Sequence, residues 1–326
     1  MAGGTDGQII TYDANGDPVA VGPGTDGHVL TSTGAGSPPA FETISSSDTL
    51  SFRNVIINGA MQIDQRNNGS SHSLGQNASA YAADRVKVTN NNCGELALTL
   101  QQLNNDAPTG FKYCSKVTIA TAESSGGTPA ADDRCSVQFR LEGNTLDRFD
   151  LGESTANDIV ISFWVKSSLT GNFGVVLTGG STPNLQYGAL YAISSADTWE
   201  KKTVKIPGPT SGTWVTSSAE GIAIKFGIYC GSNKVTSDQG VAGSGSWQSG
   251  YTAQGVTGQV QVGATGSATW QITGVQMEVG TTATDFEHRS WQDEHNACQR
   301  YYHRIGSPYG AIGDGGSFFV AYTQGS

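Results

Sequence analysis

Short stretches in which apolar and polar residues alternate set the fold class of this chain. From Ile159 to Val165, in DIVISFWVKSS, every second residue is apolar, and GIAIKFGIYCG from Gly221 to Gly231 repeats the pattern. A period of two places successive side chains on opposite faces of an extended strand, so each stretch predicts a half-buried strand of an antiparallel sheet. Segments rich in Gly, Ser, Thr and Asn separate these strands, and only 14% of residues are charged. The pattern predicts an all-β chain that folds as an antiparallel β-sandwich or jelly roll.

One stretch predicts an irregular strand. In ATWQITGVQMEVG the apolar residues Trp270 and Ile272 have one phase, whereas Val275 and Met277 have the other. A phase change of one residue is typical of a β-bulge, in which an extra residue enters one strand. The sequence therefore predicts a bulge at Gly274.

The N-terminal segment repeats itself with a period of 20 residues. GTDGQIITYDANGDPVAVGP starts at Gly4, and GTDGHVLTSTGAGSPPAFET follows at Gly24. Each copy predicts a small hairpin, and isolated hairpins are marginally stable in water, so other chains are expected to cover them. We expect either a homotrimeric stalk or docking onto a larger assembly, and the residues expected to pack there are Ile9, Ile10, Val29 and Leu30. The alternative is a flexible Gly-rich linker.

The first repeat partly matches the start of a calcium-binding loop. DANGD begins at Asp13 with acids at calcium-loop spacing, but Pro18 stands where the loop requires glycine and Gly24 where it requires a bidentate Glu. Asn-Gly is also the commonest hairpin signal. We therefore expect a turn at this position and no bound metal.

Charge and apolar run length exclude two classes of partner. The net charge is −10, and the first fifty residues contain no Lys or Arg but six acids: Asp6, Asp13, Asp17, Asp26, Glu42 and Asp48. No basic stripe compensates, so we expect no nucleic-acid partner. No apolar run approaches about 18 residues, and the N-terminus lacks a basic region followed by an apolar one. We therefore expect no membrane insertion, and synthesis in a cytoplasm without a secretion signal.

The five cysteines predict a reduced core. They are scattered without a CxxC pair, at Cys93, Cys114, Cys135, Cys230 and Cys298. Cys135, for example, is in phase with Val137 and Phe139, where small buried apolar residues belong. We expect free thiols in the core and no disulfide framework.

The segment SWQDEHNACQRYY predicts one short helix near the C-terminus. Ser290 and Asp293 have the spacing of a capping box, and Gly306 and Pro308 end the pattern, so the helix should run from about 291 to 304. Four residues at helical spacing should pack as one structural stripe: Trp291, Cys298, Tyr301 and Tyr302. The same spacing should leave Asp293, Glu294 and Arg300 mostly exposed.

This segment also holds His288, His295 and His303, but the expected helix brings only His295 and Cys298 together. A zinc site needs four ligands, or three and a water, so we expect no metal and no cofactor. The neighbouring acids alternate with Arg289 and Arg304, which favours a salt-bridged surface over an acid/base pair. No GxSxG, Cys-His signature or phosphate loop occurs, so we expect no catalytic residues and no enzyme activity.

Four stretches together resemble the landmarks, in order, of a family of bacteriophage tail-fibre and virion structural proteins. They are NVIINGAMQIDQRN (54–67), YAADRV (81–86), DIVISFWVKS (158–167) and ITGVQMEVGTTATDFEHRSWQDEHNACQRYY (272–302). The repeat at 4–43 is similar to repeats in the stalks of phage fibres. Asp64 and Val86 depart from the family, which often has Trp at both places. The resemblance implies a jelly roll related to carbohydrate-binding modules, in a virion protein that is commonly trimeric.

The resemblance also implies a place to look for a glycan site. Aromatic residues in or near Gly/Ser-rich loops are the ligand-binding candidates: Trp199, Trp214, Trp247 and Tyr251. The alternative for each is ordinary core packing, because Trp is usually largely buried.

These observations predict an organisation and a function. Residues 1–47 would form a hairpin stalk or virion anchor, 48–289 the jelly roll, 290–305 a connecting helix, and 306–326 the start of a short or truncated C-terminal β region. The leading hypothesis is a tail-fibre or appendage-fibre subunit in the virion, displaying a jelly roll that binds host-surface polysaccharide. Its other partners would be tail, baseplate or capsid proteins.

Two alternatives remain open at the level of sequence. The first is a capsid decoration or head-fibre protein with a purely structural role. The second is a polysaccharide-degrading tailspike, which is disfavoured because glycosidases need two carboxylates in a cleft and the acids here are sparse and mostly in turns. The sequence leaves open the glycan, the host, the trimer interface and the choice between tail and capsid.

Overall fold

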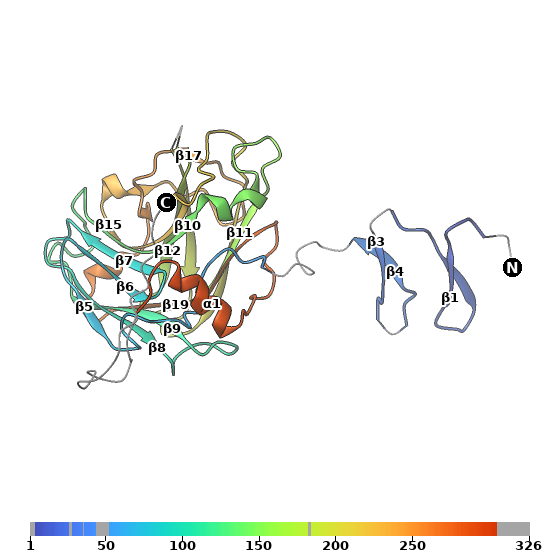
Figure 1. The fold of residues 1–326 in the computed structure, drawn as a ribbon, viewed down its shortest axis with the longest axis horizontal. Coiled ribbons are helices and arrows are strands. Elements are labelled where there is room, and N and C mark those ends of the chain that lie inside the picture. Colours follow the sequence, from blue (N-terminus) through green and yellow to red (C-terminus); the bar gives the residue numbers. More distant parts are fainter. Residues whose placement is uncertain (1–3, 26–27, 35, 44–51, 182–183, 305–326) are drawn as a thin grey trace, which may run out of the picture. The chain divides into compact units, whose positions relative to one another are not determined.

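A computed structural model describes residues 4–25, 28–34, 36–43, 52–181 and 184–304. The chain divides into two units, one ending at Phe52 and the other beginning at Arg53 (Figure 1). The predicted boundary at residue 47 and the predicted C-terminal region 306–326 lie outside the described residues.

The first unit contains the two predicted hairpins, one per repeat (Figure 1). β1 (Ile9–Tyr12) pairs with β2 (Pro18–Val21), and β3 (His28–Thr31) pairs with β4 (Ala40–Thr43), both antiparallel. Asp13 forms the first turn, because its carboxylate accepts the backbone N–H groups of Asn15 at 2.8 Å and Asp17 at 2.9 Å. These hydrogen bonds lower the pKa of Asp13. The turn predicted at DANGD is confirmed.

The second unit is an antiparallel β-sandwich, which confirms the predicted fold class. One sheet has seven strands in the order β17 (Gln248–Ser249), β13 (Leu185–Ile193), β12 (Gly171–Gly179), β15 (Glu220–Cys230), β10 (Arg134–Glu142), β7 (Val86–Asn91) and β6 (Ala78–Ala83). The other has six, in the order β14 (Glu200–Ile206), β11 (Ile159–Ser167), β19 (Thr269–Val279), β9 (Cys114–Thr121), β8 (Ala97–Leu103) and β5 (His72–Leu74). A small parallel pair joins β16 (Val235–Thr236) to β18 (Gly255–Val256).

Short helices complete this unit (Figure 1). Four are single 3₁₀ turns among the described residues: η1 (Gly143–Thr145), η2 (Asp147–Phe149), η3 (Ser232–Lys234) and η4 (Val262–Ala264). The one α-helix in the described part of the chain is α1 (Trp291–Gln299).

Aromatic side chains fill the space between the two sheets. The Phe163 ring of one sheet meets the Phe226 ring of the other edge to face, with centroids 5.0 Å apart, and Trp270 lies 5.5 Å from Phe226. All three side chains are buried. Edge-to-face pairs contribute about 1 kcal/mol each beyond the area that they bury. The alternation of apolar residues therefore does orient one face of each strand into a common core.

The opposite faces of the central strands are covered as well, so the prediction that these strands are half-buried is wrong. Lys225 of β15 is only 6% exposed, and its Nζ donates to the carbonyls of Tyr251 at 3.3 Å and Ala253 at 3.2 Å. Lys166 of β11 is 8% exposed and forms an ion pair with Asp106. Loops that cross the outer faces supply this cover, and the alternation within a strand does not report such loops. Burial lowers the pKa of Lys225 to about 8.

The predicted bulge at Gly274 is confirmed. Ser162 pairs with Gln276 and Trp164 with Thr273, so β19 has one more residue than β11 between these two pairs. Gly274 adopts a φ of +61°, and a Cβ there would lie 2.6 Å from the Phe111 ring. Glycine is needed at this position for both its conformation and its size.

The five cysteines are all buried and all free, as predicted. Burial raises the pKa of the Cys114 thiol to about 12, and the pKa of Cys298 rises to the same value for the same reason. These thiols are therefore protonated at neutral pH and act as small apolar core residues.

Helix α1 starts as predicted but is shorter than predicted. Ser290 Oγ accepts the backbone N–H of Asp293 at 3.1 Å, which confirms the cap. The helix ends at Gln299 instead of about 304. Two predictions about exposure are wrong. Glu294, expected to be mostly exposed, is only 6% exposed, and Trp291, expected to pack in the apolar stripe, is 54% exposed.

Tertiary contacts explain both differences. Glu294 is buried because one carboxylate oxygen accepts the backbone N–H of Asn58 at 2.5 Å while the other lies 3.4 Å from the Arg289 guanidinium. Trp291 belongs to the predicted stripe, but at the first turn of the helix the sandwich surface is hollowed and does not cover it. Arg300 is exposed as predicted and pairs with Glu142 at 2.8 Å.

Candidate glycan-binding groove

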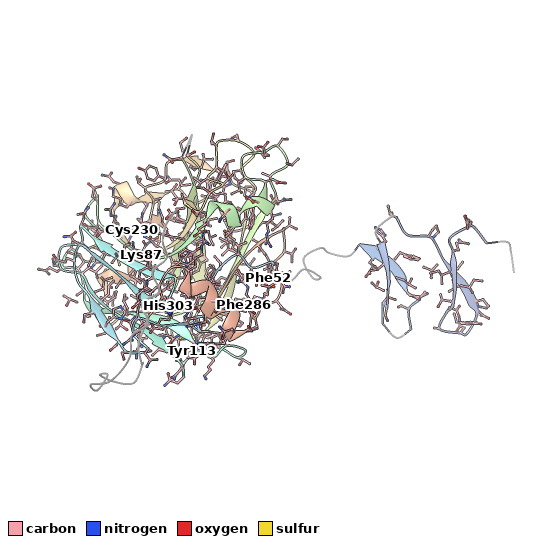
Figure 2. The ribbon with its side chains drawn as sticks, in the orientation of Figure 1. Phe52, Lys87, Tyr113, Cys230, Phe286 and His303 are labelled. Carbon is pink, nitrogen blue, oxygen red and sulfur yellow. The ribbon has the colours of Figure 1, made fainter. Side chains whose placement is uncertain are left out.

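A groove of about 620 Å³ lies between the first turns of α1, the loop at 62–69 and the end of β8. Seven amide side chains line it: Gln62, Gln65, Asn68, Gln101, Gln102, Asn104 and Asn105. Three rings line it as well, those of Tyr113, Trp291 and His295, and Figure 2 labels Tyr113 at the lower edge of the sandwich. Asp64 and Arg304 are the charged residues among the described lining. The groove therefore combines many amides with a few aromatic rings.

Asp64 shapes the loop that forms one wall of the groove. Its carboxylate accepts the backbone N–H groups of Asn67 at 3.1 Å and Gly69 at 2.9 Å. Gln101 Nε2, on β8, donates to the Gly69 carbonyl at 3.0 Å and ties the loop to the sheet. Burial raises the pKa of Asp64, and the nearby charge of Asp84 adds to the rise. The carboxylate is thus occupied with holding the loop.

Several amides of the groove keep their hydrogen-bonding groups for a ligand. In the described part of the chain, the side chains of Gln62, Asn68, Asn104 and Asn105 make no hydrogen bond with protein atoms, and the last three are exposed. Each amide offers an N–H₂ donor and a carbonyl acceptor. A sugar hydroxyl also donates and accepts, so these side chains suit it.

Trp291 and His295 form a stacked pair at the mouth of the groove. The ring centroids lie 4.6 Å apart and the planes are inclined by 12°. The two residues are one helical turn apart on α1, which places their side chains on one face. His295 covers one face of the indole, and Trp291 is still 54% exposed. An exposed ring held in one orientation provides a platform for the apolar face of a ligand.

Behind the groove, three of the motifs that carry the family resemblance meet in one cluster. The Arg66 guanidinium lies between the rings of Tyr81 and Tyr302, 4.2 Å and 3.8 Å from their centroids, and donates to Asp84 at 2.8 Å. Gln65 Nε2 donates to the same Asp84 side chain at 2.6 Å and to the Tyr302 carbonyl at 2.9 Å. These motif residues hold the helix and the 62–69 loop together, so they position the groove.

Arg85 and Tyr301 extend this cluster. The Arg85 guanidinium lies 3.6 Å from the centroid of the Tyr301 ring. Tyr301 and Tyr302 are half-buried, as the predicted structural role requires, and Cys298 is 1% exposed. Cys298 in the second half of α1 and the two tyrosines that follow the helix therefore pack against the sandwich.

None of the aromatic residues predicted as ligand-binding candidates lines this groove. Trp214 and Trp247 pack edge to face, with centroids 5.6 Å apart, and Trp214 is 8% exposed. Their indole N–H groups donate to backbone carbonyls, Trp247 to Pro207 at 2.8 Å and Trp214 to Ser211 at 3.3 Å. This geometry is that of a packing pair at one end of the sandwich.

Trp199 and Tyr251 lie apart from that pair. Trp199 is half-buried and donates its indole N–H to the Asp106 carbonyl at 2.8 Å. Tyr251 is 56% exposed, and its carbonyl accepts from Lys225. The structure thus brings only two of the four candidates together.

The sequence contains signals for the groove, but the same signals also fit a core stripe and ordinary loops. Trp291 and His295 have the i, i+4 spacing of stacked neighbours, but at helical spacing they also fit a core stripe. The amide-rich runs QRNN at 65–68 and QQLNN at 101–105 reach the groove from separate parts of the fold. Only their meeting in space distinguishes them from ordinary loops.

Two kinds of feature are absent from the described residues. Residues 4–304, outside the gaps named above, contain no group of three or more His, Cys, Asp or Glu side chains that could hold a metal ion. Among the same residues, no helix has the length and apolar character needed to cross a membrane.

No family model and no curated protein matches this chain. It is similar in fold to several solved structures. One is the enzymatically active domain of tailspike protein 4 of bacteriophage CBA120, at 12% identity and a TM-score of 0.34, covering 70% of this chain and 22% of that one. This chain therefore spans less than a quarter of that tailspike domain.

Two others are carbohydrate-binding modules. The CBM22-1 xylan-binding domain of Paenibacillus barcinonensis Xyn10C has 10% identity and a TM-score of 0.29, covering 66% of this chain and 97% of that one. TmCBM61, solved with β-1,4-galactotriose, has 10% identity and a TM-score of 0.29, covering 70% of this chain and 99% of that one. At this distance no ligand or activity of these proteins transfers to this chain.

Proposed function

We propose that this chain is a non-catalytic, glycan-binding subunit of a bacteriophage appendage fibre. One observation carries the binding function: an exposed Trp291 stacked on His295 beside amide side chains that bond to no protein atom within the described residues. The place in a virion rests on the sequence resemblance to tail-fibre and virion structural proteins. Its location would be the assembled particle.

The groove suits a saccharide for two physical reasons. A pyranose ring has an apolar C–H face that packs on an aromatic ring, and Trp291 and Tyr113 supply such rings. Its hydroxyl groups need partners that donate and accept, which Asn68, Asn104 and Asn105 supply. Binding sites of this kind combine apolar surfaces with a few placed polar groups.

The composition of the groove favours binding over cleavage. Asp64 is the only carboxyl group among the described lining residues, and its oxygens accept two backbone N–H groups. Glycoside hydrolysis requires two carboxylates on either side of the scissile bond. We therefore propose a receptor-binding role without hydrolysis, and release of reducing ends from a host polysaccharide by the purified protein would contradict it.

A binding experiment tests the proposal. The full chain would be screened against an array of bacterial surface glycans, and the best neutral glycan titrated by calorimetry. Trp291→Ala should weaken binding about tenfold or more, because truncating an aromatic anchor removes most of its contact area. Tyr251→Ala is the matched control, because Tyr251 is 56% exposed but lies outside the groove. No glycan binding, or equal loss in both variants, would overturn the proposal.

A further inference from the structure

A second groove, of about 330 Å³, lies on the outer face of the seven-stranded sheet. Three basic side chains line it, those of Lys87, Arg134 and Arg140. The rest of the lining is polar except for Ala78, and includes Asn77, Ser79, Thr89, Asn91, Gln138 and Gln254. It shares no residue with the groove at α1.

Strand pairing brings these residues onto one face. β10 and β7 are antiparallel, with Arg134 opposite Asn91 and Gln138 opposite Lys87. Residues two apart on a strand point to the same side, so Arg134, Gln138 and Arg140 share the outer face. Arg134 and Arg140 are separated by about 20 Å along the strand. The basic groups are therefore spread along an extended track.

The charge of this groove is opposite to that of the whole protein, whose net charge is −10. No acid is among the described residues that line it. Arg140 pairs with Glu220 at 3.0 Å, with both side chains almost half exposed, and Lys87 and Arg134 form no ion pair within the described part of the chain. Asp132 is close enough to Arg134 to interact electrostatically, but it pairs with Lys234 at 3.1 Å.

The arginines of the groove also act on two neighbouring lysines. Burial lowers the pKa of Lys87, and the Arg140 charge lowers it further, whereas the Glu220 charge raises it. Lys225, opposite Gln138 on β15, has a pKa lowered mainly by burial; Glu220 raises it, and Arg140 and Arg134 lower it. Cations that depress each other's pKa would be relieved by a bound anion.

A buried network around Gln138 holds part of the groove lining in place. Gln138 Nε2 donates to Thr89 Oγ1 at 3.0 Å and to Gln254 Oε1 at 2.9 Å. Gln138 Oε1 accepts from Arg140 Nη2 at 3.0 Å, which orients the guanidinium. Arg140 is thus held by Gln138 and Glu220, and in the described part of the chain Lys87 and Arg134 are the lining cations without an ion pair. The planar guanidinium of Arg134 matches the two acceptor oxygens of a carboxylate or phosphate.

We infer that this second groove binds the carboxylate or phosphate groups of an acidic polysaccharide. The hydroxyl and amide groups between the cations, such as those of Ser79 and Asn91, match sugar hydroxyls. Nucleic acid is the less suitable polyanion, because none of the described residues that line the groove carries an aromatic ring to stack a base. This inference goes beyond the proposed function, since it concerns a separate groove and a charged ligand.

Binding to paired polymers tests the inference. The full chain would be titrated with polygalacturonate, alginate and a glycerol-phosphate teichoic acid, and with fully methyl-esterified polygalacturonate as the uncharged partner of the first. At least one acidic polymer should bind, whereas the methyl ester should not. The double variant Lys87→Gln/Arg134→Gln should weaken binding of the acidic polymer about tenfold or more. Arg148→Gln/Lys201→Gln, which removes equal charge from exposed positions outside the groove, should change binding less than twofold.

The outcomes separate this groove from the first one. Trp291→Ala should keep its affinity for the acidic polymer, so loss of neutral-glycan binding and loss of acidic-polymer binding are independent results. Equal binding of the ester, absence of binding to all three acidic polymers, or equal weakening in both double variants would overturn the inference. Binding of polyuridylate as tight as that of the acidic polysaccharides would overturn the choice of ligand. Circular dichroism of each variant would establish that the sandwich is intact.

Discussion

The rings of Trp291 and His295 stack with their centroids 4.6 Å apart, one helical turn from each other on α1. The pair stands over a hollow in the sandwich surface, whereas Cys298, further along the same helix, is 1% exposed. One helix thus contributes its second half to the core and its first turn to a surface groove. This division explains how a short structural helix can also carry a binding residue.

His295→Ala tests the role of the stacked pair. Removing the imidazole leaves Trp291 without the ring that restricts its orientation, so binding of a neutral glycan should weaken about threefold to tenfold, less than in Trp291→Ala. Calorimetry with the same glycan measures the effect. His303→Ala, a change of the same size outside the described groove lining, is the control.

Gly274→Ala should destabilise the sandwich by about 1 to 3 kcal/mol. The residue has a φ of +61°, and the added Cβ would lie 2.6 Å from the Phe111 ring. The midpoint and slope of urea unfolding measure the loss. Gly266→Ala should be nearly neutral, because a Cβ there would meet no atom within 4 Å. Equal stability of the two variants would contradict the role assigned to the bulge.

Lys225 should make the protein more stable as pH rises from about 8 to 10.5. Its pKa is lowered from 10.5 to about 8, so the unfolded chain binds the proton more tightly. The contribution of Lys225 to the free energy of unfolding is therefore highest above pH 10.5, and this stabilisation is lost as pH falls to 8. The full difference amounts to about 3 kcal/mol at most. Between pH 7 and pH 10.5, wild type should therefore gain stability relative to Lys225→Met. A difference that does not change with pH would refute this.

Glu294 should make the protein less stable as pH rises above about 4.5, the opposite of the effect of Lys225. Burial raises its pKa above 4.5, despite the Asn58 N–H and the Arg289 charge. The folded state therefore holds the proton more tightly, and this stabilisation, complete below about pH 4.5, is lost as pH rises through the raised pKa. The unfolding free energy of Glu294→Gln relative to wild type should increase from pH 4 to pH 7. A stability difference that stays constant between pH 4 and pH 7 would contradict this prediction.

The hairpin repeats should assemble the protein. Ile10 is 59% exposed and Leu30 44% exposed, and Tyr12, which was not among the predicted assembly residues, is 67% exposed. Light scattering of the full chain should give a trimer, and Ile10→Asn/Leu30→Asn, or removal of residues 1–47, should dissociate it. A single species near 33.9 kDa in every case would contradict this prediction and favour a tail or capsid lattice as the partner.

Local patterns in the sequence were sufficient for the strands, the two hairpins, the Gly274 bulge and the Ser290 cap. Each depends on interactions within a few residues: strand alternation, turn geometry, or a hydroxyl that reaches a backbone N–H. The buried cysteines followed from their phase with apolar neighbours. These features required no knowledge of which strands are neighbours.

Only the tertiary structure decided which polar residues are buried and which aromatic ring is exposed. Glu294 is buried because it accepts the N–H of Asn58, and Trp291 is exposed because the loop at 62–69 and the end of β8 leave a hollow beneath it. Both depend on segments distant in sequence but adjacent in the fold. The sequence by itself thus determined the elements and their inward faces, whereas packing between distant elements decided the grooves, because a groove exists only where several surfaces meet.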